Sequence, residues 1–152
     1  MVNKGFTLIE SLIALLVVTA FVLLPSLSLA EWQRNVEEKI FFQRFERLIT
    51  ATQQAAITQN SLTKITEDKD QTEFYFWMKN MDKGTLGVQK VLTIPKSVVP
   101  KAGVSTKGMM FKEGTGNNTD MLKFSFRLAG RSTEITYQFQ LGSGKYVKKI
   151  SQ

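Results

Sequence analysis

The most prominent feature of the hydropathy pattern is a 20-residue uncharged stretch, Ser11 to Ala30, near the N-terminus. A helix rises about 1.5 Å per residue, so this stretch is long enough to cross a hydrocarbon core of about 30 Å. Lys4 precedes the stretch, and the positive-inside tendency then places the N-terminus in the cytoplasm and the remainder of the chain outside. The pattern therefore predicts one membrane-spanning helix within residues 6–30.

Beyond this stretch the apolar positions recur every three or four residues, as they do on one face of a helix. Charged residues such as Glu38 and Glu46 lie among them and are expected to face solvent. The pattern predicts an amphipathic stem helix over residues 31–60, ending at Asn60-Ser61, with its phenylalanines in a core. The apolar face is expected to consist of Trp32, Val36, Ile40, Phe41, Phe45, Leu48, Ile49, Thr52, Ala55 and Ala56.

From residue 61 onward the apolar period shifts toward two, which is typical of half-buried strands. The predicted strands are Leu62–Thr66, Thr72–Met78, Val88–Ile94, Met109–Lys112, Met121–Leu128, Thr133–Leu141 and Tyr146–Ile150. Turn residues separate them at Asp82-Lys83-Gly84, Pro95, Pro100, Gly114 to Asn118, Gly130 and Gly142-Ser143-Gly144. The predicted fold class is α+β: a long N-terminal helix, with a membrane-spanning first half, packed on a small antiparallel β-sheet head over residues 61–152.

The composition argues against most enzyme classes. The chain contains no cysteine and no histidine, which excludes disulfides, thiol nucleophiles and every Ser-His or Cys-His arrangement. No run of acidic residues has the spacing of an EF-hand loop. The sequence therefore predicts a protein that is not an enzyme and that holds no cofactor and no metal.

The positive charge is concentrated in the C-terminal half of the chain. Residues 31–80 contain 7 Lys and Arg against 8 Asp and Glu, giving −1, whereas residues 81–152 contain 12 against 4, giving +8. Clustered cations attract polyanions such as DNA, a wall polymer or an anionic lipid surface. A solvated basic surface is the alternative. The candidate residues for a non-specific phosphate contact are Lys123, Arg127, Arg131, Lys145, Lys148 and Lys149.

One charged residue interrupts the apolar N-terminus. Glu10 follows Phe6-Thr7-Leu8-Ile9 and is followed by apolar or small residues up to Thr19. A carboxylate inside a membrane segment costs roughly 2.5 to 3.5 kcal/mol at the centre, so such residues usually have a partner and a function. Glu10 therefore requires a cation close by.

These N-terminal residues resemble the leader and helix start of type IV pilins and pseudopilins. The resemblance covers Met-Val-Asn-Lys-Gly5 followed by Phe6-Thr7-Leu8-Ile9-Glu10-Ser11-Leu12. It implies that residues 1–5 are a leader peptide, that a prepilin peptidase cuts between Gly5 and Phe6, and that the new amino group of Phe6 is methylated. It also implies that Glu10 pairs with the charged N-terminus of a neighbouring subunit during assembly.

A second interpretation of the N-terminus is an ordinary secretory signal. Ser28-Leu29-Ala30 fits the small-x-small rule, so cleavage would leave Glu31 as the first residue. This interpretation leaves Glu10 unexplained and removes the helix that continues into the stem. Pro25 therefore has two interpretations. It is either a helix breaker before a cleavage site or the site of a helix kink like those in many pilin stems.

Three segments further along resemble the ComGD minor pilins of Gram-positive competence operons. They are Gln53-Gln54-Ala55-Ala56-Ile57, Met110 to Asn117 and Gln140 to Tyr146. The resemblance implies a minor pilin of a competence type IV pilus that is needed for pilus assembly and for DNA uptake in transformation. The alternatives are a pseudopilin of a type II-like secretion system and a DNA-contacting module at the pilus tip.

The same resemblance implies a set of partners and a location. The expected partners are the major pilin and other minor pilins of the same pilus, a prepilin peptidase, the membrane and, non-specifically, DNA. Membrane extraction would be powered by a separate ATPase. The expected location is the cell membrane, with a single pass and the head outside, and then the cell surface or pilus.

Overall fold

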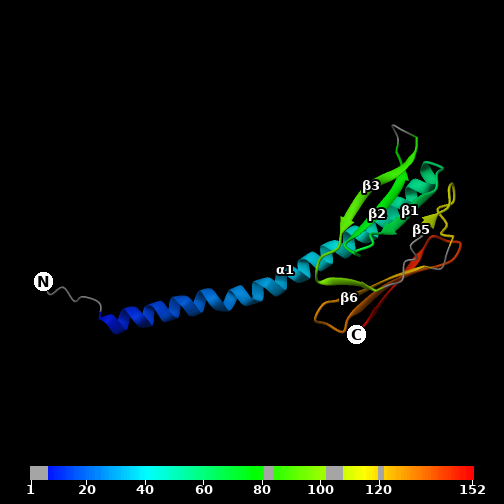
Figure 1. The fold of residues 1–152 in the computed structure, drawn as a ribbon. Coiled ribbons are helices and arrows are strands. Elements are labelled where there is room, and N and C mark those ends of the chain that lie inside the picture. Colours follow the sequence, from blue (N-terminus) through cyan, green and yellow to red (C-terminus); the bar gives the residue numbers. More distant parts are fainter. Residues whose placement is uncertain (1–6, 81–83, 102–107, 120–121) are drawn as a thin grey trace. The chain divides into compact units, whose positions relative to one another are not determined.

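The structure is a computed structural model that describes residues 7–80, 84–101, 108–119 and 122–152, with the side chains of residues 22–28 outside the description. Helix α1 extends over Leu8–Thr58 and eight strands follow it (Figure 1). The chain divides into two compact units, Met1–Glu37 and Glu38–Gln152, and each is best considered by itself.

The first unit contains the N-terminal part of α1. Its apolar side chains are exposed in the single chain; Leu8 is 83% and Phe21 77% accessible. Within the described residues, no helix combines the length and apolar character required to cross a membrane. The helix continues through Pro25, whose side chain lies outside the described residues, so the kink at this position stays a prediction.

The second unit joins the C-terminal part of α1 to two four-stranded antiparallel sheets. The first sheet has the order β3-β2-β1-β5 and comprises β1 (Thr63–Glu67), β2 (Glu73–Lys79), β3 (Leu86–Thr93) and β5 (Met109–Phe111). The second has the order β4-β6-β7-β8 and comprises β4 (Val98–Lys101), β6 (Lys123–Leu128), β7 (Glu134–Phe139) and β8 (Tyr146–Ser151). The α+β class is confirmed, although two sheets replace the single sheet expected.

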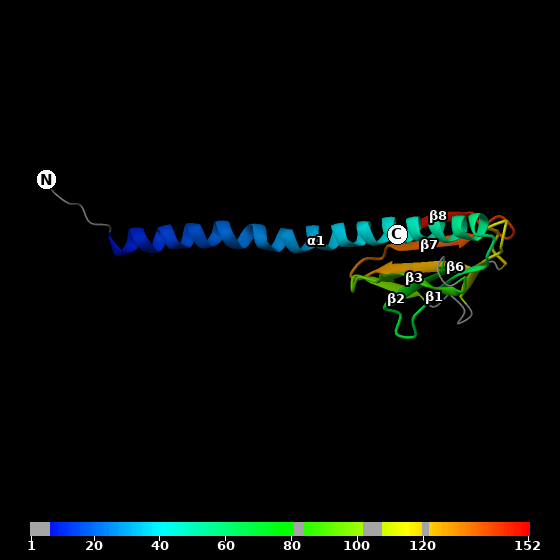
Figure 2. The same ribbon diagram turned by 90° about the horizontal axis from the view of Figure 1, so that it is seen from above.

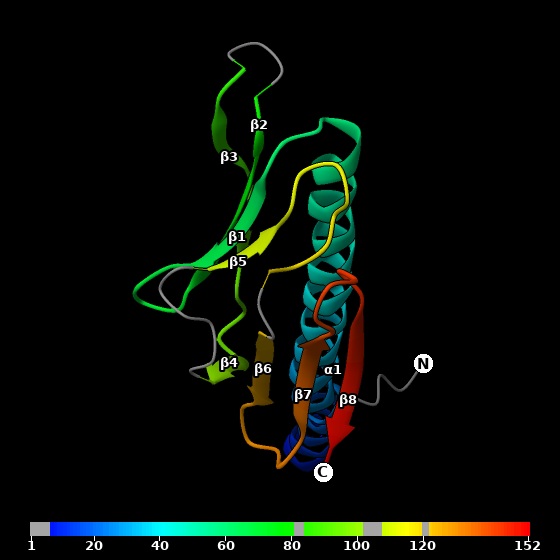
Figure 3. The same cartoon turned by 90° about the vertical axis from the view of Figure 1, so that its right-hand side faces the viewer.

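The core of this unit lies between α1 and both sheets. Phe45 is fully buried, and its ring centroid lies 5.0 Å from that of Phe74 and 5.3 Å from those of Phe124 and Phe126. Phe74 belongs to the first sheet, whereas Phe124 and Phe126 belong to the second, so one helix residue joins the two sheets. The C-terminal half of α1 lies alongside β7 and β8 (Figures 2 and 3), and Phe42 of this half stacks on Tyr137.

Four expectations about individual residues are wrong, and the first concerns Trp32, which was expected on the apolar face but is 61% exposed. Pro100 was expected in a turn, yet it lies in β4, which pairs only with β6 and, as an edge strand, tolerates the missing N–H of proline. Glu38 was expected in solvent but is 4% exposed, because it binds Arg131. Ile40 was expected on the buried face but is 41% exposed. The remaining core face is confirmed for Phe41, Phe45, Ile49, Thr52, Ala55 and Ala56.

Candidate functional site

The helix start contains the first candidate site, a pair of reciprocal hydrogen bonds between Thr7 and Glu10. The backbone N–H of Glu10 donates to Thr7 Oγ1 at 3.3 Å, and the backbone N–H of Thr7 donates to Glu10 Oε2 at 3.3 Å. The Thr7 hydroxyl also donates to Oε2 at 3.3 Å. This is a capping box, which satisfies backbone donors that the first turn of a helix leaves without partners.

The capping box gives Glu10 a local function that sequence reasoning missed. The signature was visible, because a threonine followed three residues later by glutamate, just before an apolar run, marks a helix start. The carboxylate at this position remains surrounded by exposed apolar side chains, including Leu12 at 57% and Ile13 at 58% accessibility. Gly5 and Phe6, the expected cleavage and methylation residues, lie outside the described residues.

A second cluster attaches α1 to the β4-β6-β7-β8 sheet. Glu46 Oε1 accepts hydrogen bonds from Tyr137 Oη at 2.8 Å and from Lys148 Nζ at 2.8 Å. The Lys148 ammonium also lies 5.5 Å from the centroid of the Tyr137 ring, within cation–π range. One turn or more towards the N-terminus, Arg131 Nη1 forms an ion pair with Glu38 Oε2 at 3.2 Å. Two acids of the stem are therefore held by cations of the sheet.

The cluster also shifts the ionisation of its members. Partial burial raises the pKa of Glu46, but hydrogen bonds from Lys148 and Tyr137 outweigh this effect and leave the pKa below its ordinary value of 4.5. Burial, followed by the hydrogen bond to Glu46, raises the pKa of Tyr137 far above its usual value of 10.0. The phenol therefore stays protonated and remains a hydrogen-bond donor at all physiological pH values.

The lowered pKa of Glu46 predicts an acid-sensitive contribution to stability. A carboxylate whose pKa is lower in the folded than in the unfolded state stabilises the fold above its unfolded pKa, and this contribution disappears as the pH falls through the folded pKa. We therefore expect Glu46→Gln to lower the melting temperature at pH 7, with the difference from the unchanged chain beginning to shrink as the pH falls below about 4.3 and vanishing below the folded pKa of Glu46. Thermal unfolding followed by circular dichroism at several pH values measures this. Glu113→Gln, at an exposed acid, is the control, and a difference of the same size at pH 7 and at pH 3 would refute the assignment.

The three segments that resemble ComGD proteins meet at the end of α1. Gln53 Nε2 donates to the Gly116 carbonyl oxygen at 3.1 Å, and the Gly114 N–H donates to the Ala56 carbonyl oxygen at 3.0 Å. Gly144 is buried against Gln53 and Gly116, has a φ of +63°, and leaves no room for a Cβ atom. These residues, separated by up to about 90 positions, therefore form one junction between the stem and two loops.

The structure does not bring the six candidate phosphate-binding residues together. Successive residues of a strand face opposite sides, so Lys148 faces α1 and binds Glu46, whereas Lys149 faces outward. Arg131 binds Glu38, and Lys145 lies in the turn before β8. Lys123 and Arg127 share the outward face of β6 with Lys149 of β8. Lys148 therefore does not share a face with Lys149.

A solved structure has the same arrangement of a long helix on antiparallel sheets. The minor pseudopilin EpsH from the type 2 secretion system of Vibrio cholerae matches with a TM-score of 0.53 and 14% identity, over 74% of this chain and 94% of that chain. A scan against protein-family models found no match. The protein therefore has the fold class of a pilin-like subunit.

The particular family follows from a sequence relative. The chain is 31% identical to the competence protein ComGD of Streptococcus pneumoniae strain R6 over 151 residues, which cover 98% of this chain and 81% of that protein. The chain belongs to the ComGD family of competence proteins. The family resemblance found in the sequence is therefore confirmed.

Proposed function

We propose that this minor pilin of a competence pilus acts in pilus assembly, and through it in DNA uptake during transformation, without catalysis of its own. The subunit contributes its N-terminal helix to the fibre and its head to contacts with neighbouring subunits. Its partners are the major pilin and the other minor pilins of the same pilus. Membership of the ComGD family is the observation that carries this proposal.

Maturation is the first step of the proposed function. A prepilin peptidase removes residues 1–5 and methylates the amino group of Phe6. The new N-terminus is then four residues before Glu10 in the sequence, and the Glu10 side chain is already oriented by its hydrogen bonds to Thr7. Before assembly, the uncharged stretch Ser11 to Ala30 holds the subunit in the membrane with its head outside.

Charge pairing is the second step. A carboxylate among apolar side chains is stabilised when an opposite charge comes within about 4 Å. The methylated amino group of a neighbouring subunit supplies that charge, and the exposed apolar residues between Leu8 and Phe21 become covered by neighbouring helices. Contact with neighbouring helices also lowers the free-energy cost of leaving the membrane, because the apolar surface of the helix moves from lipid into contact with protein.

The proposal is tested by following an epitope-tagged chain in cells with an intact competence system. We expect the tagged chain in sheared pili, at far lower abundance than the major pilin, and loss of both pili and transformation when its gene is deleted. A secretion pseudopilin would instead leave transformation intact and alter the set of secreted proteins. Absence of the chain from pili together with normal transformation would contradict the proposal.

A further inference from the structure

The outward face of the β4-β6-β7-β8 sheet is built from alternate residues of four paired strands. The inward residues Phe124, Phe126 and Tyr137 are buried against α1, so their strand neighbours face the other way. The sheet register places eleven residues on the outward face: Val99, Lys101, Lys123, Ser125, Arg127, Glu134, Thr136, Gln138, Val147, Lys149 and Ser151.

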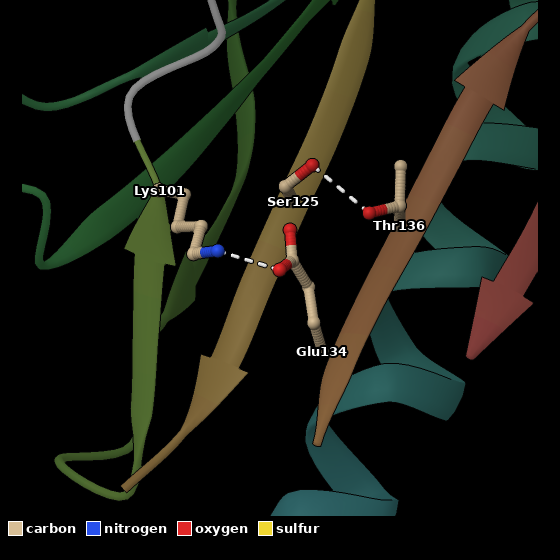
Figure 4. Close-up of polar contacts among 4 residues, drawn as sticks. All are labelled: Lys101, Ser125, Glu134 and Thr136. Atoms are coloured by element: carbon tan, nitrogen blue, oxygen red, sulfur yellow. Dashed lines mark hydrogen bonds and ion pairs between the residues drawn. The ribbon is translucent and has the colours of Figure 1, made fainter. Parts of the chain in front are cut away.

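The register aligns two lysines and two hydroxyl groups in one row across this face. Lys101 is opposite Ser125, Ser125 is opposite Thr136, and Thr136 is opposite Lys149. The Ser125 and Thr136 hydroxyl oxygens lie 3.0 Å apart, as Figure 4 shows. With strands about 4.8 Å apart, the Cα atoms of Lys101 and Lys149 are separated by roughly 14 Å.

Two more cations flank the centre of this row along β6. Lys123 and Arg127 lie two residues before and after Ser125, roughly 13 Å from each other at about 3.3 Å per residue. Ser125 thus has a cation on each of its four sides. Both Lys123 and Arg127 are exposed, and neither has an ion-pair partner in the described part of the chain.

The face has a strong excess of positive charge. It carries four cations, Lys101, Lys123, Arg127 and Lys149, and one acid, Glu134, which gives a formal charge of +3. The acid is already engaged by Lys101 (Figure 4). Cations held on a flat sheet face keep their side chains directed at solvent, where they attract a polyanion over about 10 Å at moderate salt.

We propose that the cations of this outward face, Lys101, Lys123, Arg127 and Lys149, bind the phosphate backbone of duplex DNA. Lysine, arginine and hydroxyl side chains are the groups that contact DNA phosphates without reading the base sequence. The inference rests on the proposed function in DNA uptake and assigns the surface that makes the contact. Lys148 and Arg131 have no part in it, because they face the stem and bind Glu46 and Glu38.

The residue types of the face favour duplex DNA over other polyanions. Stacking of unpaired bases requires aromatic side chains, and none is among the eleven outward residues. Binding to a lipid surface is strengthened by large apolar side chains that enter the headgroup region, whereas the apolar residues here are two valines on the edge strands, Val99 and Val147. Ser125 is buried, so the accessible part of the face consists mainly of the cations around it, which fit a backbone of regularly spaced phosphates.

The test measures binding of the purified full chain, in detergent, to a fluorescent 30-base-pair duplex across a range of salt concentrations. The test variant is Lys123→Gln/Arg127→Gln/Lys149→Gln, which removes three cations from the face but keeps the Lys101–Glu134 pair. We expect roughly tenfold weaker binding at low salt and a salt slope reduced by about 2.7, since each phosphate contact contributes about 0.9. The single variant Lys123→Gln, with a slope change of about 0.9, serves if the triple variant does not fold.

The matched control is Lys69→Gln/Lys90→Gln/Lys112→Gln, which removes the same charge from three exposed positions outside the face. It should leave the salt slope nearly unchanged. Equal weakening by both triple variants, or by neither, would overturn the proposal, as would a test variant that loses binding only to phosphatidylglycerol vesicles. Incorporation into pili is measured in parallel. If the test variant binds DNA as the unaltered chain does and enters pili normally, the DNA-binding face is rejected but the proposed function is not. If the unaltered chain does not enter pili, the proposed function is rejected.

Discussion

Replacing Gly144 with alanine is expected to destabilise the folded head by about 3 kcal/mol. Two costs add at this position. The φ of +63° is unfavourable for any residue with a side chain, and the new Cβ atom would overlap the Gly116 carbonyl oxygen and the Gln53 side chain. Because small domains are stable by only about 5 to 15 kcal/mol, this loss is a large fraction of the total. Urea unfolding of the full chain in detergent, followed by near-ultraviolet circular dichroism, measures the change.

Gly142→Ala is the matched control for this substitution. Gly142 lies in the same turn and has a similar φ of +73°, but a Cβ atom there meets nothing within 4 Å. The control should therefore cost only the conformational part, about 1 kcal/mol. The difference in unfolding free energy between the two variants measures the contribution of packing between the end of the stem and the two loops. Equal destabilisation by both substitutions would show that Gly144 matters for turn geometry alone and that the junction is not tightly packed.

Glu10→Gln is expected to abolish incorporation into pili while leaving the helix start intact. Glutamine can replace glutamate in a capping box, so the hydrogen bonds to Thr7 are retained and only the negative charge is lost. Loss of one partner from an ion pair in an apolar environment costs about 3 to 5 kcal/mol, which corresponds to a decrease of roughly a hundredfold or more in incorporation. Quantitative immunoblotting of sheared pili, with removal of the leader verified for each variant, gives the measurement.

Thr7→Ala is the reciprocal variant, because it keeps the carboxylate but removes the threonine hydroxyl from both side-chain hydrogen bonds. It should cost the helix start about 1 kcal/mol and leave incorporation largely intact. The opposite pattern, in which Glu10→Gln assembles normally and Thr7→Ala does not, would mean that Glu10 acts only as a helix cap. The pair of variants thus separates the two functions that the structure and the sequence assign to one side chain.

The strands were largely predictable because each leaves a local signature. Alternating apolar residues located seven of the eight strands, and the glycine-rich turn from Gly142 to Gly144 located the last hairpin. The exception is β4, which is only four residues long and contains Pro100, a residue that marks turns more often than strands. The division into two sheets could not be predicted, because a strand's periodicity does not specify its partner.

The sites were less predictable than the strands because they depend on contacts between distant residues. The burial of Glu38 requires Arg131, which is 93 positions away in the sequence. The basic face requires Lys101, whose strand was not predicted, and excludes Lys148, whose acid partner Glu46 is 102 positions away. The capping box at Thr7 and Glu10, in contrast, is local and its signature is present in the sequence. It was missed because Glu10 was interpreted only as a charge that requires a partner.

The mass of the N-terminal peptide of the protein purified from competent cells is the most direct test of the proposed maturation and charge pairing. We expect the peptide to begin at Phe6 and to carry one methyl group on its α-amino nitrogen, because the proposed cleavage and methylation would produce the cation that pairs with Glu10. A protein beginning at Glu31 would instead have lost the entire apolar helix. That result would contradict both the maturation scheme and the charge pairing on which the proposed assembly depends.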